Sequence, residues 1–244
     1  MTDRRAAARG KLIVALDVPS AADARRLVAA LKGHVGLFKV GLELFVSAGP
    51  SLVDAIADLS DADIFLDLKL HDIPATMRAA IAAASKPRVR FLTVHCEQPD
   101  RLVGAGTGQA APQLLGVTAL TSIGQAEMTA AGWFAPGLTV EELVLRRAAI
   151  ARDAGCAGVV CSGNEVRAIK RTLGRELMVV TPGIRPAWAA VPGDDQRRAV
   201  TPAEAIAAGA DFIVVGRPIR AAKDPGEAAE RVVDEIEETL GQAG

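Results

Sequence analysis

The stretch DLKLHDIP, residues 67–74, holds the residues best suited to chemistry. Asp67, Lys69 and His71 occupy alternate positions, and leucines stand between them. Because side chains two apart on a strand share a face, these three should project together while the leucines pack behind the strand. An isolated ion on an inward face is costly, so the charges must pair. An ammonium group held charged by carboxylates can donate a proton or stabilise a developing negative charge.

Three further charged residues are expected to lie close to this stretch. Lys39 lies near the end of the preceding apolar run, and we expect it to pair with Asp67. Asp72 follows in the next loop, and Asp17 ends the first apolar run. A buried ion-pair network that only fixes strand register is the alternative for such a cluster. Two lysines and two acids, with no adjoining cluster of His and carboxylates suited to a metal, favour chemistry.

A second signal follows the last two apolar runs. The segment at 181–198 is long and rich in Gly and Pro, and Gly-Arg-Pro-Ile at 216–219 closes the eighth run. The backbone amides of Gly216 and Arg217, the Arg217 guanidinium and an amide donor such as Gln196 suit an anion. A solvated surface arginine is the alternative for Arg217. Because the loops after strands seven and eight of an α/β barrel frequently bind phosphate, we favour a phosphate site.

Eight short apolar runs position these residues. They lie at 11–17, 36–41, 62–70, 89–95, 114–120, 157–162, 177–183 and 211–218. Helical patterns with capping signals lie between them: Ser20 and Thr139 are candidate N-caps, and Pro74 and Pro202 suit a first helical turn. Strands that alternate with helices pair in parallel, because each crossover helix returns the chain to the same end of the sheet.

Eight strand–helix units in 244 residues predict an α/β fold, the (β/α)8 TIM barrel. An open doubly wound sheet is the alternative, but no G-x-G-x-x-G follows the first run. No linker or low-complexity tract divides the chain. We therefore predict a single domain over residues 1–244, with a flexible N-terminus over residues 1–10. The candidate residues lie at the C-terminal ends of strands, which form the active face of such a barrel.

Composition excludes several classes of protein. A net charge of -1 and 3% aromatic residues argue against a nucleic-acid binder. No run of 18 apolar residues and no signal-peptide pattern occurs, which predicts a protein without a membrane span. Cys96, Cys156 and Cys161 fit neither a disulfide framework nor a zinc site, so we read them as idle thiols and expect a cytoplasmic location.

These motifs, taken in order, closely resemble the orotidine 5'-monophosphate decarboxylase family, which completes UMP synthesis. The family's D-x-K-x-x-D pattern appears as Asp67-Leu-Lys69-Leu-His-Asp72. That pattern alone is weak evidence, since related phosphate-handling barrels share it. The resemblance extends over nearly the whole chain through LIVALDVP, FKVGLELF around Lys39, LTS at 120–122, VVCS at 159–162, TPGIRP at 181–186, GDDQRR at 193–198 and GRPI.

The resemblance implies a role for each matching position. Lys39, Asp67 and Lys69, with Asp72 from the other subunit of a homodimer, would form an alternating charge network. It also implies that Asp17 and Lys39 bind the ribose and that Ser122 contacts the pyrimidine. Ile73 and Thr76 would come from the partner subunit. The phosphate would be held by Gln196, Gly216 and Arg217. The family uses neither a metal nor an organic cofactor.

The reaction implied is decarboxylation of orotidine 5'-monophosphate to UMP, the last step of de novo pyrimidine biosynthesis. Loss of CO2 from C6 leaves an electron pair that the ring delocalises poorly, and Lys69 would stabilise and then protonate that carbon. One alternative is a sugar-phosphate decarboxylase or aldolase of the same barrel superfamily. Another is a non-catalytic sensor of a phosphorylated ligand, although mere binding does not require an internal proton donor.

Two places depart from the family pattern. Ala75 stands where the family usually has Asn, which affects a contact at the dimer edge. HCEQPD at 95–100 replaces a stretch that is often small and rich in Gly, and it affects the barrel mouth beside His95. His71 fits a structural role better than a catalytic one, whereas His95 is open to either reading. Neither departure changes a residue proposed for the chemistry.

Overall fold

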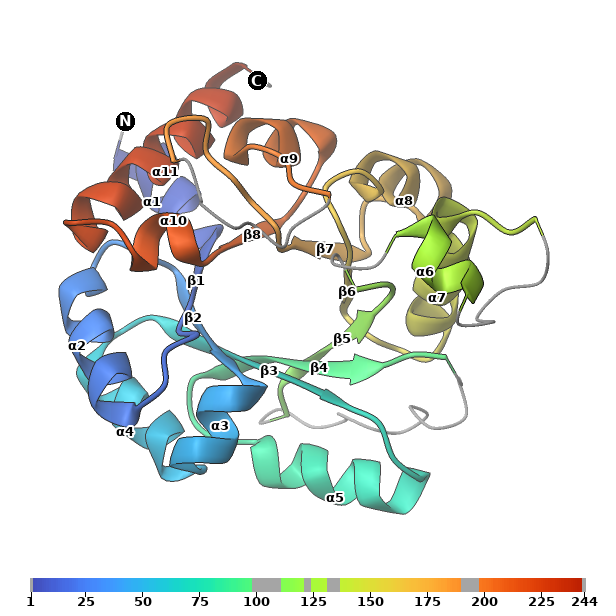
Figure 1. The fold of residues 1–244 in the computed structure, drawn as a ribbon, viewed down its shortest axis with the longest axis horizontal. Coiled ribbons are helices and arrows are strands. Elements are labelled where there is room, and N and C mark those ends of the chain that lie inside the picture. The colour runs from blue at the N-terminus through green and yellow to red at the C-terminus, as the bar shows by residue number, and fades with distance from the viewer. Residues whose placement is uncertain (1, 98–110, 121–123, 131–136, 190–197, 243–244) are drawn as a thin grey trace.

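Eight parallel strands close into a barrel in this computed structural model, as Figure 1 shows down the ring of strands. The structure describes residues 2–97, 111–120, 124–130, 137–189 and 198–242. Each strand pairs in parallel with the next, and β8 closes onto β1. The strands are β1 (Leu12–Ala15), β2 (Leu37–Gly41), β3 (Asp63–Leu70), β4 (Val89–His95), β5 (Gln113–Val117), β6 (Gly158–Val160), β7 (Met178–Thr181) and β8 (Phe212–Val215). The predicted (β/α)8 barrel is confirmed, and each predicted apolar run contains or overlaps one strand.

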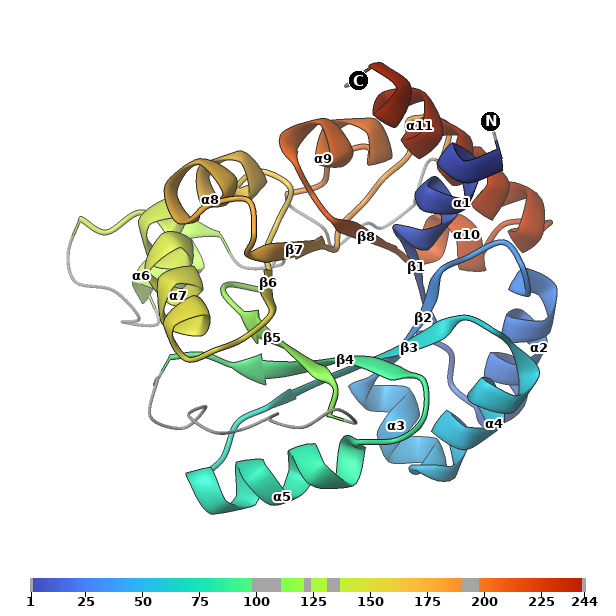
Figure 2. The same ribbon diagram turned by 180° about the vertical axis from the view of Figure 1, so that it is seen from behind.

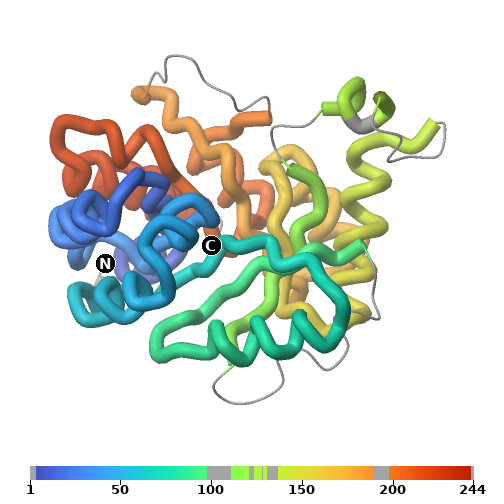
Figure 3. Tube along the Cα trace, turned by 60° about the horizontal axis from the view of Figure 1, so that its bottom comes forward, coloured from blue at the N-terminus to red at the C-terminus, as the bar shows by residue number. Residues whose placement is uncertain are grey.

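Helices surround the barrel, and every described connection between successive strands contains one or more helices, whereas most of the segment between β4 and β5 lies outside the described residues (Figure 1). They are α1 (Thr2–Gly10), α2 (Ala21–Leu31), α3 (Leu42–Ala48), α4 (Ser51–Leu59), α5 (Pro74–Ala84), α6 (Gln125–Ala130), α7 (Val140–Asp153), α8 (Val166–Leu173), α9 (Pro202–Ala208), α10 (Arg217–Arg220) and α11 (Pro225–Gln242). Figure 3 follows the order of these elements along the chain.

Local sequence signals set several helix boundaries. The Ser20 hydroxyl accepts a hydrogen bond from the Asp23 amide at the start of α2. Thr139 forms a capping box with Glu142 at the start of α7, and Pro74 occupies the first turn of α5. These contacts satisfy amide groups that have no partner within the helix, which confirms the predicted helix starts.

Aromatic side chains fill the interior of the barrel. Phe91 packs edge to face against Phe65 and Phe212, with ring centroids 6.0 and 5.2 Å apart. The inner cluster is completed by smaller side chains: Ile13, Ala15, Leu37, Leu115, Val180 and Val214. Because alternate residues of a strand face inward, the next inward positions of β2 and β3 are Lys39 and Asp67. The apolar interior therefore forms a floor beneath a charged mouth.

The first helix packs against the last one. Figure 2 shows α1 beside α11, and Ala8 of α1 is fully buried. Arg5 pairs with three acids of α11, namely Glu230, Asp234 and Glu237, and we call these four residues the terminal network. Residues 2–10, which we expected to belong to a flexible N-terminus, form α1 and pack against α11. The sequence reading tested this segment only as a targeting signal and overlooked its pairing with the acidic last helix.

No helix among the residues that the structure describes is long and apolar enough to cross a membrane.

Candidate active site

A cavity of about 490 Å³ opens at the C-terminal ends of the strands. Several residues singled out in the sequence line it, although they are distant along the chain: Asp17, Lys39, Asp67, Lys69, Gly216 and Arg217. Apolar residues such as Val117, Val160 and Val214 also line it. A cavity that combines apolar walls with a few convergent polar groups is the usual form of a small-molecule site.

Four charged side chains alternate in sign across the mouth. We call Asp17, Lys39, Asp67 and Lys69 the mouth network. Lys39 Nζ lies 3.0 Å from Asp17 Oδ1 and 3.4 Å from Asp67 Oδ2, and Lys69 Nζ lies 2.8 Å from Asp67 Oδ1. The expected pairing of Lys39 with Asp67 is present. The Lys39 side chain is 11% exposed and that of Lys69 is 35% exposed, so Lys69 is the more accessible ammonium group.

The mouth network keeps its buried members charged. Burial alone lowers the pKa of Lys39, but the charges of Asp67 and Asp17 outweigh it and raise that pKa above 10.5. Burial likewise raises the pKa of Asp67, but Lys39 and Lys69, with a hydrogen bond from Thr93, bring it below 3.8. Both groups are therefore ionised at neutral pH.

One glycine makes room for this pairing. A Cβ atom on Gly41 would lie 2.9 Å from Asp17 Oδ1 and 3.2 Å from Lys39 Nζ. Gly41 ends β2 two residues after Lys39, so a side chain at Gly41 would point into the barrel mouth, as Lys39 does. A side chain there would displace the carboxylate or the ammonium group.

Strand β3 departs from regular geometry where it carries its charges. Its pairing with β4 shifts register between Leu66 and Leu70, and Lys69 has a φ of 50°. A left-handed conformation at a residue other than glycine costs about 1–3 kcal/mol and occurs often at functional sites. The buried Thr93 supports it: its Oγ1 accepts from the Lys69 amide at 2.8 Å and donates to Asp67 Oδ1 at 3.1 Å. The sequence reading assumed regular alternation and missed both the shift and Thr93.

The part of the cavity wall that follows β7 and β8 is rich in arginine. Gly216 and Arg217 lie there, at the junction of β8 and α10. Arg185 and Arg220 line the same wall, and the sequence reading did not single them out. The Arg185 amide donates to the Val200 carbonyl at 2.9 Å, which holds the two ends of the loop after β7 together. The signal for Arg185 was its place in TPGIRP, directly after a strand.

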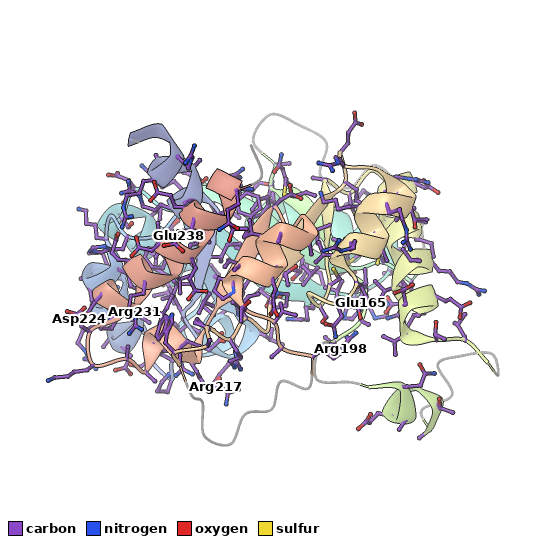
Figure 4. All side chains as sticks on the ribbon, turned by 90° about the horizontal axis from the view of Figure 1, so that it is seen from above. Glu165, Arg198, Arg217, Asp224, Arg231 and Glu238 are labelled. Atoms are coloured by element: carbon purple, nitrogen blue, oxygen red, sulfur yellow. The ribbon has the colours of Figure 1, made fainter. Side chains whose placement is uncertain are left out.

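A buried ion pair stands beside this wall. Arg198 Nη1 donates to Glu165 Oε1 at 2.7 Å, and the two side chains are 12% and 7% exposed. The Arg198 guanidinium group also donates to the Leu120 carbonyl at 3.1 Å, and the backbone carbonyl of Arg198 accepts from the Ser162 hydroxyl at 3.2 Å. Figure 4 shows Glu165 and Arg198 at the same end of the barrel as Arg217. The pair ties together the segments that follow β5, β6 and β7.

Some predicted site residues do not reach this cavity. Asp72, Ile73 and Thr76 are exposed around the start of α5, outside the described lining of the cavity. The Asp72 carboxylate accepts a hydrogen bond from the Ile73 amide at 2.7 Å. Ser122 and Gln196 lie outside the described residues, so their predicted contacts stay predictions.

The two histidines of this face belong to a separate cluster. The rings of His71 and His95 lie 5.1 Å apart, and His95 Nδ1 lies 3.1 Å from Glu97 Oε1. Arg147 Nη2 lies 3.3 Å from the same Glu97 oxygen. Burial raises the pKa of Glu97, but the contacts with His95 and Arg147 outweigh it and lower that pKa to about 2. Neither histidine is among the described residues that line the cavity.

The described part of the chain holds no group of three or more His, Cys, Asp or Glu side chains placed to bind a metal. The cysteines are free and buried. Burial raises the pKa of Cys96 to about 12 and that of Cys156 to about 11, so these thiols stay protonated and unreactive at neutral pH. This agrees with their reading as idle thiols.

The geometry suits a ligand that spans the barrel mouth. One side offers an ammonium group held by carboxylates, which can stabilise negative charge on a neighbouring atom and donate a proton to it. The other side offers guanidinium groups and backbone amides, which suit a phosphate. A substrate with a phosphate at one end and a reacting carbon at the other fits both sides.

Comparisons with known proteins agree with this arrangement. The family model described as orotidine 5'-phosphate decarboxylase / HUMPS family matches residues 10–232. A curated protein of Desulfosudis oleivorans, named orotidine 5'-phosphate decarboxylase, is 46% identical and covers 98% of this chain and 98% of its own. A protein of the same name from Syntrophotalea carbinolica is also 46% identical, covering 96% of this chain and 97% of its own.

Solved structures show the same fold. Orotidine 5'-phosphate decarboxylase from Lactobacillus acidophilus superposes with a TM-score of 0.78 at 35% identity, covering 92% of this chain and 98% of that one. The enzyme of the same name from Pyrococcus horikoshii gives a TM-score of 0.68 at 23% identity, covering 92% and 98%, and it bears on the fold alone.

Proposed function

The chain belongs to the orotidine 5'-phosphate decarboxylase / HUMPS family, and from this premise we propose that it converts orotidine 5'-monophosphate to UMP and CO2. This reaction would be the last step of de novo pyrimidine biosynthesis. The observation that carries the proposal is the mouth network, which holds the Lys69 ammonium group 2.8 Å from Asp67 at the wall of the cavity.

Lys69 acts on the reacting carbon. The bond between C6 and the carboxylate breaks, CO2 leaves, and the electron pair stays on C6. The ammonium group stabilises this pair and transfers a proton to it, and the neutral amine then regains a proton from solvent. Asp67 holds the ammonium group in place through its hydrogen bond.

Asp67 also acts on the departing group, to a smaller extent. A substrate carboxylate beside Asp67 is repelled, and two like charges 4 Å apart cost about 4 kcal/mol at an effective dielectric constant of 20. Enzymes lower barriers by about 8–23 kcal/mol, so this repulsion supplies only part of the total. Stabilisation of the carbanion by Lys69 ranks first.

The remaining residues position the substrate. Asp17 and Lys39 bind the ribose hydroxyl groups, Ser122 contacts the pyrimidine, and Gln196, Gly216 and Arg217 hold the 5'-phosphate. Support comes from the cavity, whose lining includes Asp17 and Lys39 as well as Gly216 and Arg217. Phosphate binding far from C6 provides binding energy that can stabilise the reactive arrangement.

We further propose a homodimer with shared active sites. Asp72, Ile73 and Thr76 are exposed on their own subunit, where they can reach a partner's cavity. Ile73 is 60% exposed, and on α3 Leu42 and Val46 are 56% and 75% exposed. Large apolar side chains left in water favour an interface that covers them.

Mixed subunits test the shared site. Neither a Lys69→Ala subunit nor an Asp72→Ala subunit should be active by itself. A hybrid dimer has one site with both defects and one with neither, so equal mixing should restore about a quarter of wild-type activity. If the mixture is no more active than the separate variants, the two residues belong to the same site within one subunit.

The reaction itself is tested with metal-free protein. Protein treated with a chelator is incubated with orotidine 5'-monophosphate, and the loss of substrate absorbance is followed as UMP forms. We expect full turnover without added metal. Activity that depends on a divalent cation, or turnover of a sugar phosphate in place of the nucleotide, would support the alternative of another decarboxylase or aldolase.

A further inference from the structure

Arg220 is a second arginine of α10 that lines the cavity. It follows Arg217 by three residues, and side chains three apart on a helix are neighbours. Helical side chains lean toward the N-terminus of their helix, which for Arg220 means toward Gly216 and Arg217. Arg220 therefore belongs to the wall on which the phosphate is proposed to bind.

Among the residues that the structure describes, none forms a hydrogen bond or an ion pair with the Arg220 side chain. Its Nε is buried and makes no hydrogen bond, and no residue that the structure describes forms an ion pair with its guanidinium group. Two other partly buried arginines of this face form ion pairs, Arg198 with Glu165 and Arg147 with Glu97, although Arg198 Nε is also buried without a hydrogen bond. A half-buried donor group without an acceptor is costly, so its presence calls for an acceptor from elsewhere.

The cavity itself does not supply that acceptor. The acids among its described lining residues are Asp17 and Asp67, and both already bond to lysines of the mouth network. Within that network two carboxylates balance two ammonium groups. The positive charge of Arg220 is thus available to pair with a negatively charged ligand.

We propose that Arg220 is a direct ligand of the substrate's 5'-phosphate, in addition to the residues that the family resemblance places there. This inference rests on the proposed function, because the anion that Arg220 would bind is the phosphate of the nucleotide. The planar guanidinium fork can donate two parallel hydrogen bonds to phosphate oxygens, which a lysine cannot do. Arg220 thereby increases the preference of the site for a nucleotide over a nucleoside.

Binding of UMP and of uridine to Arg220→Ala tests this role by calorimetry. We expect UMP affinity to fall about tenfold to a hundredfold, because a charge-assisted pair is lost. Uridine lacks the phosphate and should bind wild type and variant equally. Arg220→Lys should give an intermediate loss and provides the same comparison if the alanine variant folds poorly. Arg25→Ala, at an exposed position on α2, is the matched control and should leave both affinities unchanged.

Unchanged UMP affinity in the Arg220 variants would overturn the inference, and so would an equal loss of UMP and uridine binding. The inference and the proposed function can fail separately. A wild-type protein that binds UMP through Arg220 but releases no CO2 from orotidine 5'-monophosphate would contradict only the proposed function. A protein that releases CO2 and binds UMP without help from Arg220 would contradict only the inference.

Discussion

The mouth network and the terminal network join similar charges in different surroundings. In the mouth network, Lys39 and Asp67 are 11% and 15% exposed, and both keep their charges through each other. In the terminal network, Arg5 is 39% exposed and reaches three acids of α11 across the surface. Both tie together distant parts of the chain. They differ in how much water reaches the charges.

Burial changes what an ion pair does. A solvated pair contributes little, because water and salt weaken its attraction and the side chains lose freedom. A buried pair stabilises little overall, yet removing one partner leaves a charge without compensation. The mouth network also includes a left-handed Lys69, which a pair serving stability alone does not need. These differences support the proposal that the mouth network acts in chemistry, whereas the terminal network attaches α1 to α11.

Removing the proposed proton donor should have the largest effect. Lys69→Ala should lower turnover of orotidine 5'-monophosphate by about 10⁴-fold, since it removes both proton transfer and carbanion stabilisation. UMP binding should remain measurable, because Gly216 and Arg217, which are proposed to hold the phosphate, are unchanged. Lys86→Ala removes a lysine that pairs with Asp54 on the surface and should retain full turnover. Substantial activity in Lys69→Ala would exclude this residue as the donor.

Removing the Asp67 carboxylate, which pairs with both Lys39 and Lys69, should have the next largest effect. Asp67→Asn keeps the shape of the side chain but leaves buried Lys39 with Asp17 alone, so the free energy of unfolding should fall by about 3 kcal/mol. Urea unfolding measures this loss. Asp234→Asn makes the same change in the terminal network and should cost far less. Equal losses from the two variants would remove the distinction between the networks.

The same variant has a defined pH dependence. Because the pKa of Asp67 in the folded protein lies below its ordinary value of 3.8, its contribution to stability is fully present above pH 3.8. That contribution is lost as pH falls through the lower, folded-state pKa. The difference in unfolding free energy between wild type and Asp67→Asn should thus stay constant near neutral pH and shrink only under strongly acidic conditions. A change centred near neutral pH would contradict this.

Sequence predicted the barrel and the composition of the mouth, for identifiable reasons. Apolar runs mark strands, and strand ends converge at one face, so the pairing of Lys39 with Asp67 follows from the sequence. The conformation of Lys69 could not be predicted, because lysine gives no signal for a left-handed backbone. Thr93 and Arg220 were missed because a threonine in a strand and an arginine in a helix usually have no special role.

Thr93 offers a smaller test of the mouth network. Thr93→Val removes the hydroxyl group that links the Lys69 amide to the Asp67 carboxylate, at nearly unchanged size. One lost hydrogen bond in a buried site corresponds to about 1–2 kcal/mol, so kcat should fall about tenfold. KM should change little, because Thr93 is absent from the cavity lining described here. Thr93→Ser retains the hydroxyl group and should recover most of kcat; failure to do so would show that the methyl group matters instead.

The smallest effect is expected in the terminal network. Arg5→Ala removes the cation that three acids share, yet all four side chains are partly solvated. The free energy of unfolding should fall by about 1 kcal/mol at low salt, and the loss should shrink in about 1 M salt, where the acids are screened from one another. Turnover should equal that of wild type. Urea unfolding at the two salt concentrations and a parallel activity assay measure both. A loss of activity, or a loss of several kcal/mol that salt does not reduce, would mean that α1 supports the barrel through buried contacts such as Ala8 rather than through its charges.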